Sequence, residues 1–134
     1  MLEVLAIDHI VLRTSKLDEM LEFYTKVLSC TIERETLKET GLTQLRAGNA
    51  LIDLVVVNSK LGAIGGGAPR KTARNVDHFC LQIKPMPEQE IINHLTKNGI
   101  EVGEFASRYG AQGLGNSIYI QDPEGNGVEL RCRI

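Results

Sequence analysis

The sequence has little of what marks nucleic-acid-binding, membrane or secreted proteins. Its formal net charge of −2 excludes the strong basic field that attracts a phosphate backbone. No apolar run approaches the length that spans a bilayer, and the N-terminus lacks the basic and apolar regions of a secretory signal. We therefore expect a cytoplasmic protein with neither membrane nor nucleic acid among its partners.

Cysteine is sparse and unpatterned. Cys30, Cys80 and Cys132 are odd in number and form no CxxC spacing, which argues against a disulfide framework and against a thiolate zinc site. Each of them is expected to be a buried structural thiol. The chain also lacks low-complexity tracts and runs of like charge, and its 134 residues, 43% of them apolar, are typical of a single domain.

An internal repeat is the most informative feature that is present. It pairs two runs rich in strand-forming residues, Asp8-His9-Ile10-Val11-Leu12 and Asp77-His78-Phe79-Cys80-Leu81. An amphipathic stretch of helical period follows each run, at Leu17–Leu28 and at Pro87–Asn98. The remaining strands are expected at Cys30–Leu37, Thr43–Ala47, Ala50–Val57, Val102–Phe105, Ser117–Gln121 and Val128–Arg133.

This order of elements is βαβββ, twice. It predicts an α+β fold of one domain, residues 1–134, with module one at about residues 1–60 and module two at about residues 74–134. The modules are expected to form a cupped mixed sheet with the helices on its outer face. Between them, Gly62–Pro69 lacks the lysine and hydroxyl residue of a P-loop, so a flexible connector is expected.

Period-two alternation sorts the strand residues into an apolar and a polar face. The polar face carries His9, Arg13, Gln44, Arg46, Asp53, His78, Gln82, Ser117, Tyr119, Gln121, Glu129, Arg131 and Arg133. Such a face either meets water or lines a polar cup. Histidines and carboxylates stand at equivalent places in both modules, and this equivalence favours the cup.

The polar face contains a donor set for one divalent metal ion. Its two imidazoles, of His9 and His78, and its carboxylates suit Zn, Ni, Fe(II), Mn or Co. The two histidines and Glu129 alone make a facial triad with open positions for substrate or oxygen. Asp53 as a further ligand gives four protein donors and fewer open positions. The residue types leave both arrangements open.

A family resemblance rests on four segments: Asp8–Leu12, Phe23–Leu28, Val76–Leu81 and Tyr119–Leu130. In this combination the chain resembles the vicinal oxygen chelate superfamily, which contains glyoxalase I, the bleomycin resistance proteins and the extradiol dioxygenases. The resemblance implies paired βαβββ modules around one metal ion, with His9, Asp53, His78 and Glu129 as its ligands. Similar glyoxalase I enzymes usually have glutamate at the place of Asp53, whose side chain is one methylene shorter.

The resemblance also implies chemistry on a small oxygenated substrate. In this superfamily a metal bound to two vicinal oxygens stabilises an enediolate, so we expect a lyase or isomerase of glyoxalase type with Glu129 or Asp53 as catalytic base. Arg108–Gly113 reads Arg-x-Gly-Ala-x-Gly, and its glycines suit a mobile lid. The candidate substrate-binding residues, whose arginines favour an anionic substrate, are Arg13, Arg46, Arg108, Tyr119 and Arg131.

Two other functions are compatible with the resemblance. One is an Fe(II) extradiol-type dioxygenase, and the other is a metal-free protein that sequesters an antibiotic or a similar ligand. The second predicts apolar residues at the ligand positions, whereas His9, His78 and Glu129 are intact. Proteins of this kind commonly form homodimers, so the site is expected either within one chain or across two.

Overall fold

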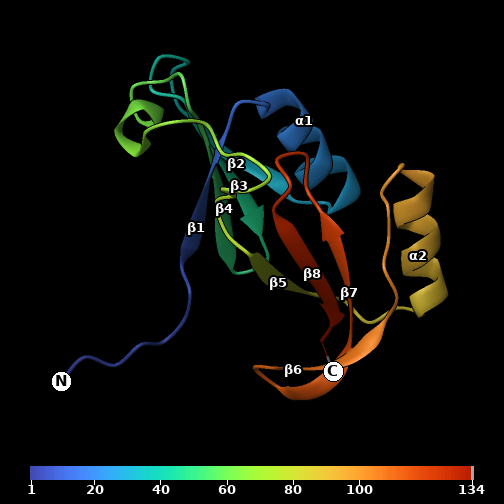
Figure 1. Cartoon of the computed structure of the whole chain (residues 1–134). Helices are drawn as coiled ribbons and strands as arrows, with labels where there is room; N and C mark the ends of the chain where they lie inside the picture. Colours follow the sequence, from blue (N-terminus) through green and yellow to red (C-terminus); the bar gives the residue numbers. More distant parts are fainter. Residues whose placement is uncertain (134) are drawn as a thin grey trace. The chain divides into compact units, whose positions relative to one another are not determined.

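The computed structural model describes residues 1–133 and divides them into two compact units (Figure 1). The N-terminal unit covers residues 1–75 and the C-terminal unit begins at Val76. In the N-terminal unit, short 3-10 and π-helical segments at Gly62–Gly65 and Phe23–Val27 accompany one α-helix and four strands. These are β1 (His9–Thr14), α1 (Leu17–Glu22), β2 (Thr31–Glu35), β3 (Leu42–Ala47) and β4 (Ala50–Val56).

The C-terminal unit repeats this order of elements. Its elements are β5 (His78–Ile83), α2 (Glu88–Lys97), β6 (Ala106–Gly110), β7 (Gly113–Gln121) and β8 (Gly127–Cys132). The strand orders are β1-β4-β3-β2 and β5-β8-β7-β6, so each unit has its own four-stranded mixed sheet. In both sheets the first and last strands of the module are parallel and the other neighbouring pairs are antiparallel. The prediction of an α+β fold built from two βαβββ modules is confirmed.

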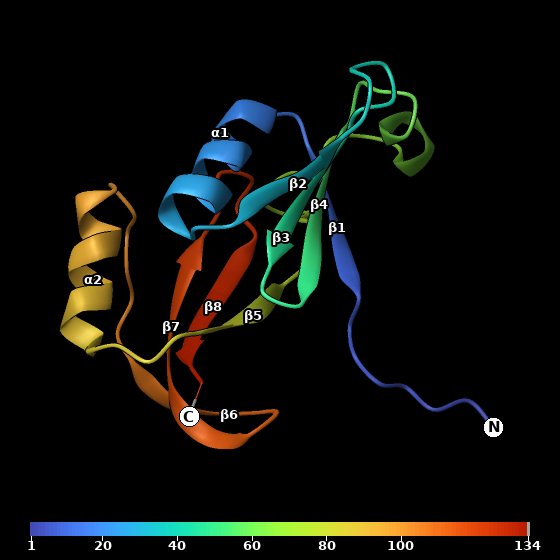
Figure 2. The same cartoon turned by 180° about the vertical axis from the view of Figure 1, so that it is seen from behind.

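The apolar positions of the repeat form a core in each unit. In the N-terminal unit the buried side chains include Leu12, Ile52 and Leu54 of the sheet and Met20 of α1. In the C-terminal unit the buried apolar side chains are Ile91 and Leu95 of α2, and Ile118, Ile120, Val128 and Leu130 of the sheet. Figure 2 shows α2 running alongside its sheet. Burial of one strand face leaves the alternate residues for the opposite, polar face.

The β6–β7 hairpin differs from the prediction. A strand was expected at Val102–Phe105 and a mobile lid at Arg108–Gly113, but the strand lies at Ala106–Gly110 and pairs with β7. Gly110 pairs with Gly113, and Gly113 follows the turn with a positive φ of 92°, a backbone conformation that glycine adopts without strain. Glycines that suggested mobility therefore make a tight turn between two paired strands.

The described helices include none with the length and hydropathy that a membrane crossing requires.

Candidate metal centre

Each unit presents a histidine whose orientation is fixed by the preceding aspartate. His9 Nδ1 lies 2.7 Å from Asp8 Oδ1, and His78 Nδ1 lies 2.7 Å from Asp77 Oδ2. An ionised carboxylate only accepts hydrogen bonds, so the proton of the neutral imidazole is on Nδ1. The lone pair is therefore on Nε2, which is the arrangement found in metal-binding histidines. Both Asp-His pairs of the repeat have this arrangement.

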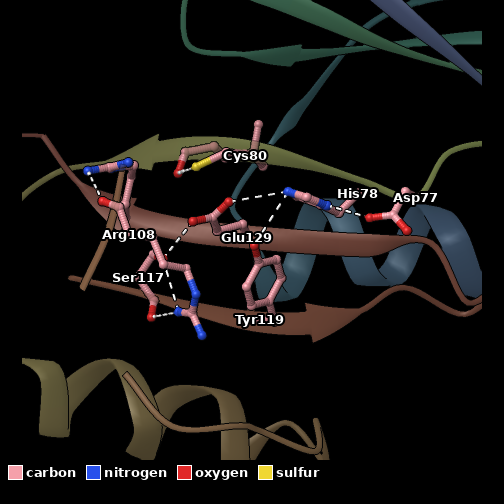
Figure 3. A network of polar contacts seen from close by, with 9 residues as sticks. Asp77, His78, Cys80, Arg108, Ser117, Tyr119 and Glu129 are labelled. Carbon is pink, nitrogen blue, oxygen red and sulfur yellow. Dashed lines mark hydrogen bonds and ion pairs between the residues drawn. The ribbon is translucent and has the colours of Figure 1, made fainter. Parts of the chain in front are cut away.

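The second donor of the C-terminal unit is the carboxylate of Glu129, in the middle of β8 (Figure 3). Glu129 is only 6% exposed. Its Oε1 accepts a hydrogen bond of 2.6 Å from Ser117 Oγ, and its Oε2 lies 3.5 Å from His78 Nε2. The hydroxyl of Tyr119 lies 3.5 Å from the same His78 nitrogen. Burial and the Glu129 carboxylate raise the pKa of Tyr119, so the phenol remains protonated at neutral pH.

The spacing of the His78 and Glu129 donor atoms fits a shared ion. Two ligand atoms that each lie about 2.1 Å from one ion, at a tetrahedral angle, are about 3.4 Å apart. The observed separation of Nε2 and Oε2 is 3.5 Å. These two side chains therefore suit a divalent ion without a large rearrangement.

The N-terminal unit places Asp53 at the corresponding position but holds it differently. Asp53 is 4% exposed, and both of its carboxylate oxygens accept hydrogen bonds of 3.2 Å from Gln44 Nε2. Within residues 1–133 it forms no ion pair with His9, as expected of a side chain one methylene shorter than glutamate. Charge still couples the two groups, because the Asp8 hydrogen bond and, more weakly, the Asp53 charge raise the pKa of His9.

Two of the predicted substrate-binding arginines in the N-terminal unit have protein partners. Arg13 donates from its terminal nitrogens to three carbonyls of the glycine-rich connector, at Gly62, Gly66 and Gly67. Arg46 forms an ion pair of 3.0 Å with Glu33 and lowers the pKa of that carboxyl group. Arg13 thus orders the connector, while Arg46 remains about 40% exposed beside its partner.

The C-terminal unit gathers the other three predicted residues around the hairpin. The Arg108 guanidinium donates to Ser117 Oγ at 3.1 Å and lies 4.5 Å from the centre of the Tyr119 ring. Arg131 donates to the backbone carbonyls of Arg108 and Gly113. Tyr119 and Arg108 therefore lie next to the donors, while Arg131 secures the hairpin.

Three features of this centre were not predicted from the sequence. Ser117 and Gln44 were assigned to the polar face, but nothing in the repeat indicated that they hold carboxylates. Cys80 was expected to be buried like Cys30, yet it is exposed because it shares the strand parity of His78. Cys132 is also only partly buried. Partial desolvation of the Cys80 thiol and the neighbouring Glu129 charge raise the pKa of Cys80 to about 11.

The donors occur in pairs in the described part of the chain. No group of three His, Cys, Asp or Glu side chains among residues 1–133 stands close enough together to hold an ion. Each unit instead offers one imidazole and one carboxylate. Two donors leave most positions of a metal ion for other ligands.

Comparison with known proteins gives a consistent assignment. The profile of the Glyoxalase/Bleomycin resistance protein/Dioxygenase superfamily matches residues 6–130. The catechol-2,3-dioxygenase of Bacillus subtilis is 24% identical over 115 residues, which are 85% of this chain and 36% of that protein. The chain thus spans about a third of the length of this curated relative.

Solved structures share the fold along almost their whole length. An integron cassette protein from V. cholerae is 23% identical, with a TM-score of 0.80 over 100% of this chain and 99% of that chain. The lactoylglutathione lyase of Agrobacterium tumefaciens is also 23% identical, with a TM-score of 0.68 over 95% of this chain and 92% of that one. At such identities the likeness concerns the fold alone.

Proposed function

We propose a divalent-metal-dependent reaction of glyoxalase type for this chain, which belongs to the Glyoxalase/Bleomycin resistance protein/Dioxygenase superfamily. The reaction is a lyase or isomerase step on a small oxygenated substrate. The observation that carries the proposal is the 3.5 Å separation of His78 Nε2 and Glu129 Oε2, with the histidine oriented by Asp77. Two donors at chelating distance, one of them fixed by an outer carboxylate, are a usual component of metal sites.

The proposed ligand set is His9, His78 and Glu129, and Asp53 is the candidate fourth ligand. Imidazole and carboxylate donors suit Zn, Ni, Fe(II), Mn and Co. Such an ion supplies Lewis acidity that polarises adjacent substrate oxygens and stabilises negative charge on them. The matching Asp-His pairs support the participation of both histidines, because each leaves Nε2 available.

The two carboxylates are proposed to divide the work of binding and proton transfer. Glu129 Oε1 is engaged by the short Ser117 hydrogen bond, which favours a fixed ligand. Asp53 receives only two longer bonds of 3.2 Å from a single amide nitrogen, and the His9 imidazole lies within its electrostatic influence. A weakly held carboxylate is the better acceptor of a substrate proton, so Asp53 is the proposed base.

Metal analysis of the purified protein, followed by metal removal and titration, tests this proposal. Wild type is expected to bind one divalent ion per site, and His9→Ala, His78→Ala and Glu129→Ala are each expected to weaken that binding. Asp53→Asn separates a four-ligand from a three-ligand site, because it loses affinity only if Asp53 is a ligand. Undiminished affinity in all three alanine variants would refute the proposal.

An Fe(II) extradiol-type dioxygenase is the second candidate. Similarity to a catechol-2,3-dioxygenase favours it, although the chain covers only 36% of that protein. His9, His78 and Glu129 would then act as a facial triad. Oxygen uptake by the Fe(II)-loaded protein in the presence of a catechol distinguishes this candidate, since a glyoxalase-type isomerisation consumes no oxygen.

A small anionic substrate and a homodimer complete the proposal, with a cytoplasmic location as the sequence predicts. Arg46 and Arg108 on the polar faces support an anionic substrate. The dimer is supported by the N-terminal segment, whose large apolar side chains are exposed: Leu2 at 98%, Val4 at 90%, Leu5 at 89% and Ile7 at 74%. A group of exposed apolar side chains is typical of protein interfaces. Sedimentation of the full chain and of a variant lacking residues 1–7 tests this part.

A further inference from the structure

A buried hydroxyl stands behind the Glu129 carboxylate. Ser117 lies on β7, is 0% exposed, and its Oγ is 2.6 Å from Glu129 Oε1 (Figure 3). Arg108 donates to the same hydroxyl oxygen at 3.1 Å. A guanidinium group has no acceptor, so the Ser117 oxygen accepts this bond and its single proton points to Glu129. The order of donation is therefore Arg108 to Ser117 to Glu129.

This order of donation makes the two oxygens of Glu129 unequal. Oε1 receives a short bond from a hydroxyl, of the kind that forms when the acceptor is charged. Oε2 is the oxygen that lies 3.5 Å from His78 Nε2. Rotation of the carboxylate would break a buried hydrogen bond, which opposes any arrangement in which both oxygens face the same ion.

Two glycines of the β6–β7 hairpin explain how Arg108 reaches this position. A Cβ atom on Gly110 would lie 1.9 Å from an Arg131 nitrogen, and one on Gly115 would lie 2.7 Å from another. These glycines thus leave room for the Arg131 guanidinium, which donates to the carbonyls of Arg108 and Gly113. Arg131 holds the hairpin in the place from which Arg108 contacts Ser117.

The N-terminal unit has no such hydroxyl. Ser117 pairs with Arg131 across β7 and β8, and the corresponding pair across β3 and β4 is Leu42 with Val55. Leucine offers no hydrogen bond, and Asp53 is instead held through both of its oxygens by Gln44. The hydrogen bond from a buried hydroxyl is therefore found at Glu129 and not at Asp53, so the fold does not require it.

We infer that Ser117, supported by Arg108, is a positioning residue that makes Glu129 bind the metal ion through Oε2 alone. The inference rests on the proposed function. A carboxylate that uses one oxygen leaves one more position of the ion open to substrate than a carboxylate that uses both.

The test compares the divalent metal affinity of wild type and variants by competition with a chromophoric chelator, using Co²⁺ as the probe. Ser117→Ala is expected to weaken binding about 10–100-fold, the usual effect of removing an outer partner of a metal ligand. Arg108→Met keeps the side-chain length but removes the donor, and it should weaken binding less. Their combination should cost little more than Ser117→Ala alone, because the two residues act in series.

A matched control removes a different buried hydroxyl. Ser59, 7% exposed, donates to the Val56 carbonyl and accepts from the Gly62 N–H in the N-terminal unit. Ser59→Ala is expected to leave Co²⁺ affinity unchanged. The Co²⁺ absorption spectrum is a second readout, and only loss of positioning should alter it in Ser117→Ala and Arg108→Met.

The outcomes separate this inference from the proposed function. If Glu129→Gln, His9→Ala and His78→Ala all bind Co²⁺ as tightly as wild type, the proposed function fails. If Glu129→Gln loses binding while Ser117→Ala and Arg108→Met keep wild-type affinity and spectrum, the positioning role alone is wrong. Should Ser117→Ala fold poorly, the partly exposed Arg108→Met substitution decides by the same two readouts.

Discussion

The two units build the same pair of donors on the same rungs of their sheets, but they hold the carboxylate differently. In each unit the histidine begins the first strand and pairs with a residue of the closing strand, Leu51 for His9 and Gly127 for His78. The acid, Asp53 or Glu129, lies two residues after that paired residue. Glu129 is held at one oxygen by a hydroxyl, whereas Asp53 is held at both oxygens by an amide. The comparison shows that a duplicated framework keeps the donors while the contacts behind them diverge.

Each unit also has one arginine at the same level of its sheet, but on a different strand. Arg13 pairs with Val55 in the N-terminal sheet, and Gln82 pairs with Arg131 at the corresponding rung of the C-terminal sheet. Either way one arginine stands at that rung, and it donates to the carbonyls of a glycine-containing segment. The charge has the same task in both units, although it is carried by different strands.

The largest expected effect tests whether the C-terminal pair dominates metal binding. His78→Ala removes the imidazole at chelating distance from Glu129 and should weaken metal affinity by on the order of 100-fold or more, beyond the range for outer partners. His9→Ala should cost less, since within residues 1–133 no carboxylate forms an ion pair with His9 Nε2. Calorimetric titration of both variants measures the difference. Equal losses would mean that the two units contribute alike.

A smaller effect is expected from the aspartates that orient the histidines. Asp77→Asn and Asp8→Asn each replace a charged acceptor with an amide and should weaken metal binding about 10–100-fold. The loss should be greater for Asp77→Asn if the C-terminal pair dominates. Chelator competition measures both, and thermal unfolding of the metal-free variants serves as the control for folding. Unchanged affinity in both variants would exclude an orienting role.

Lengthening the short carboxylate should make the units more alike. Asp53→Glu restores the methylene that separates this side chain from its counterpart Glu129, and we expect metal affinity to rise several-fold, within about 1 kcal/mol. The absorption spectrum of the Co²⁺ form should change at the same time. A loss of affinity would indicate that the Gln44 contact with Asp53 matters more than reach.

The smallest effect concerns the protonation of His9. Because the Asp8 hydrogen bond raises the pKa of His9, Asp8→Asn should lower that pKa towards the ordinary value, as followed by NMR of the metal-free protein. A raised pKa stabilises the folded protein below the pKa of the unfolded chain, and this contribution is lost as pH rises through the folded-state pKa. A pKa that stays raised in the variant would assign the shift to Asp53.

The repeat predicted the framework because it acts through local rules. Strand alternation placed His78 and Glu129 on one face, and the helical period located α2 to within one residue at each end. The hairpin was not predictable in this way. Gly110 and Gly113 read as flexible in sequence, and only the register of β6 with β7 and the approach of Arg131 give them a structural role.

The contacts behind the carboxylates were beyond the sequence for the same reason. Ser117 is twelve residues from Glu129 in the chain and touches it only because β7 and β8 pair antiparallel. The tasks of Arg13 and Arg131 depend on where glycine-containing segments return to the sheet. The alternation of strand residues predicted the face on which these side chains lie, but tertiary contacts determine their hydrogen-bond partners.

X-ray absorption at the zinc edge of the Zn²⁺-loaded protein tests the central claim most directly, because it counts the imidazole ligands of the ion. We predict a first shell of nitrogen and oxygen at about 2.0–2.1 Å with scattering from two imidazoles, reduced to one imidazole in His9→Ala and in His78→Ala. A wild-type spectrum without imidazole scattering, or one that neither variant alters, would contradict the account.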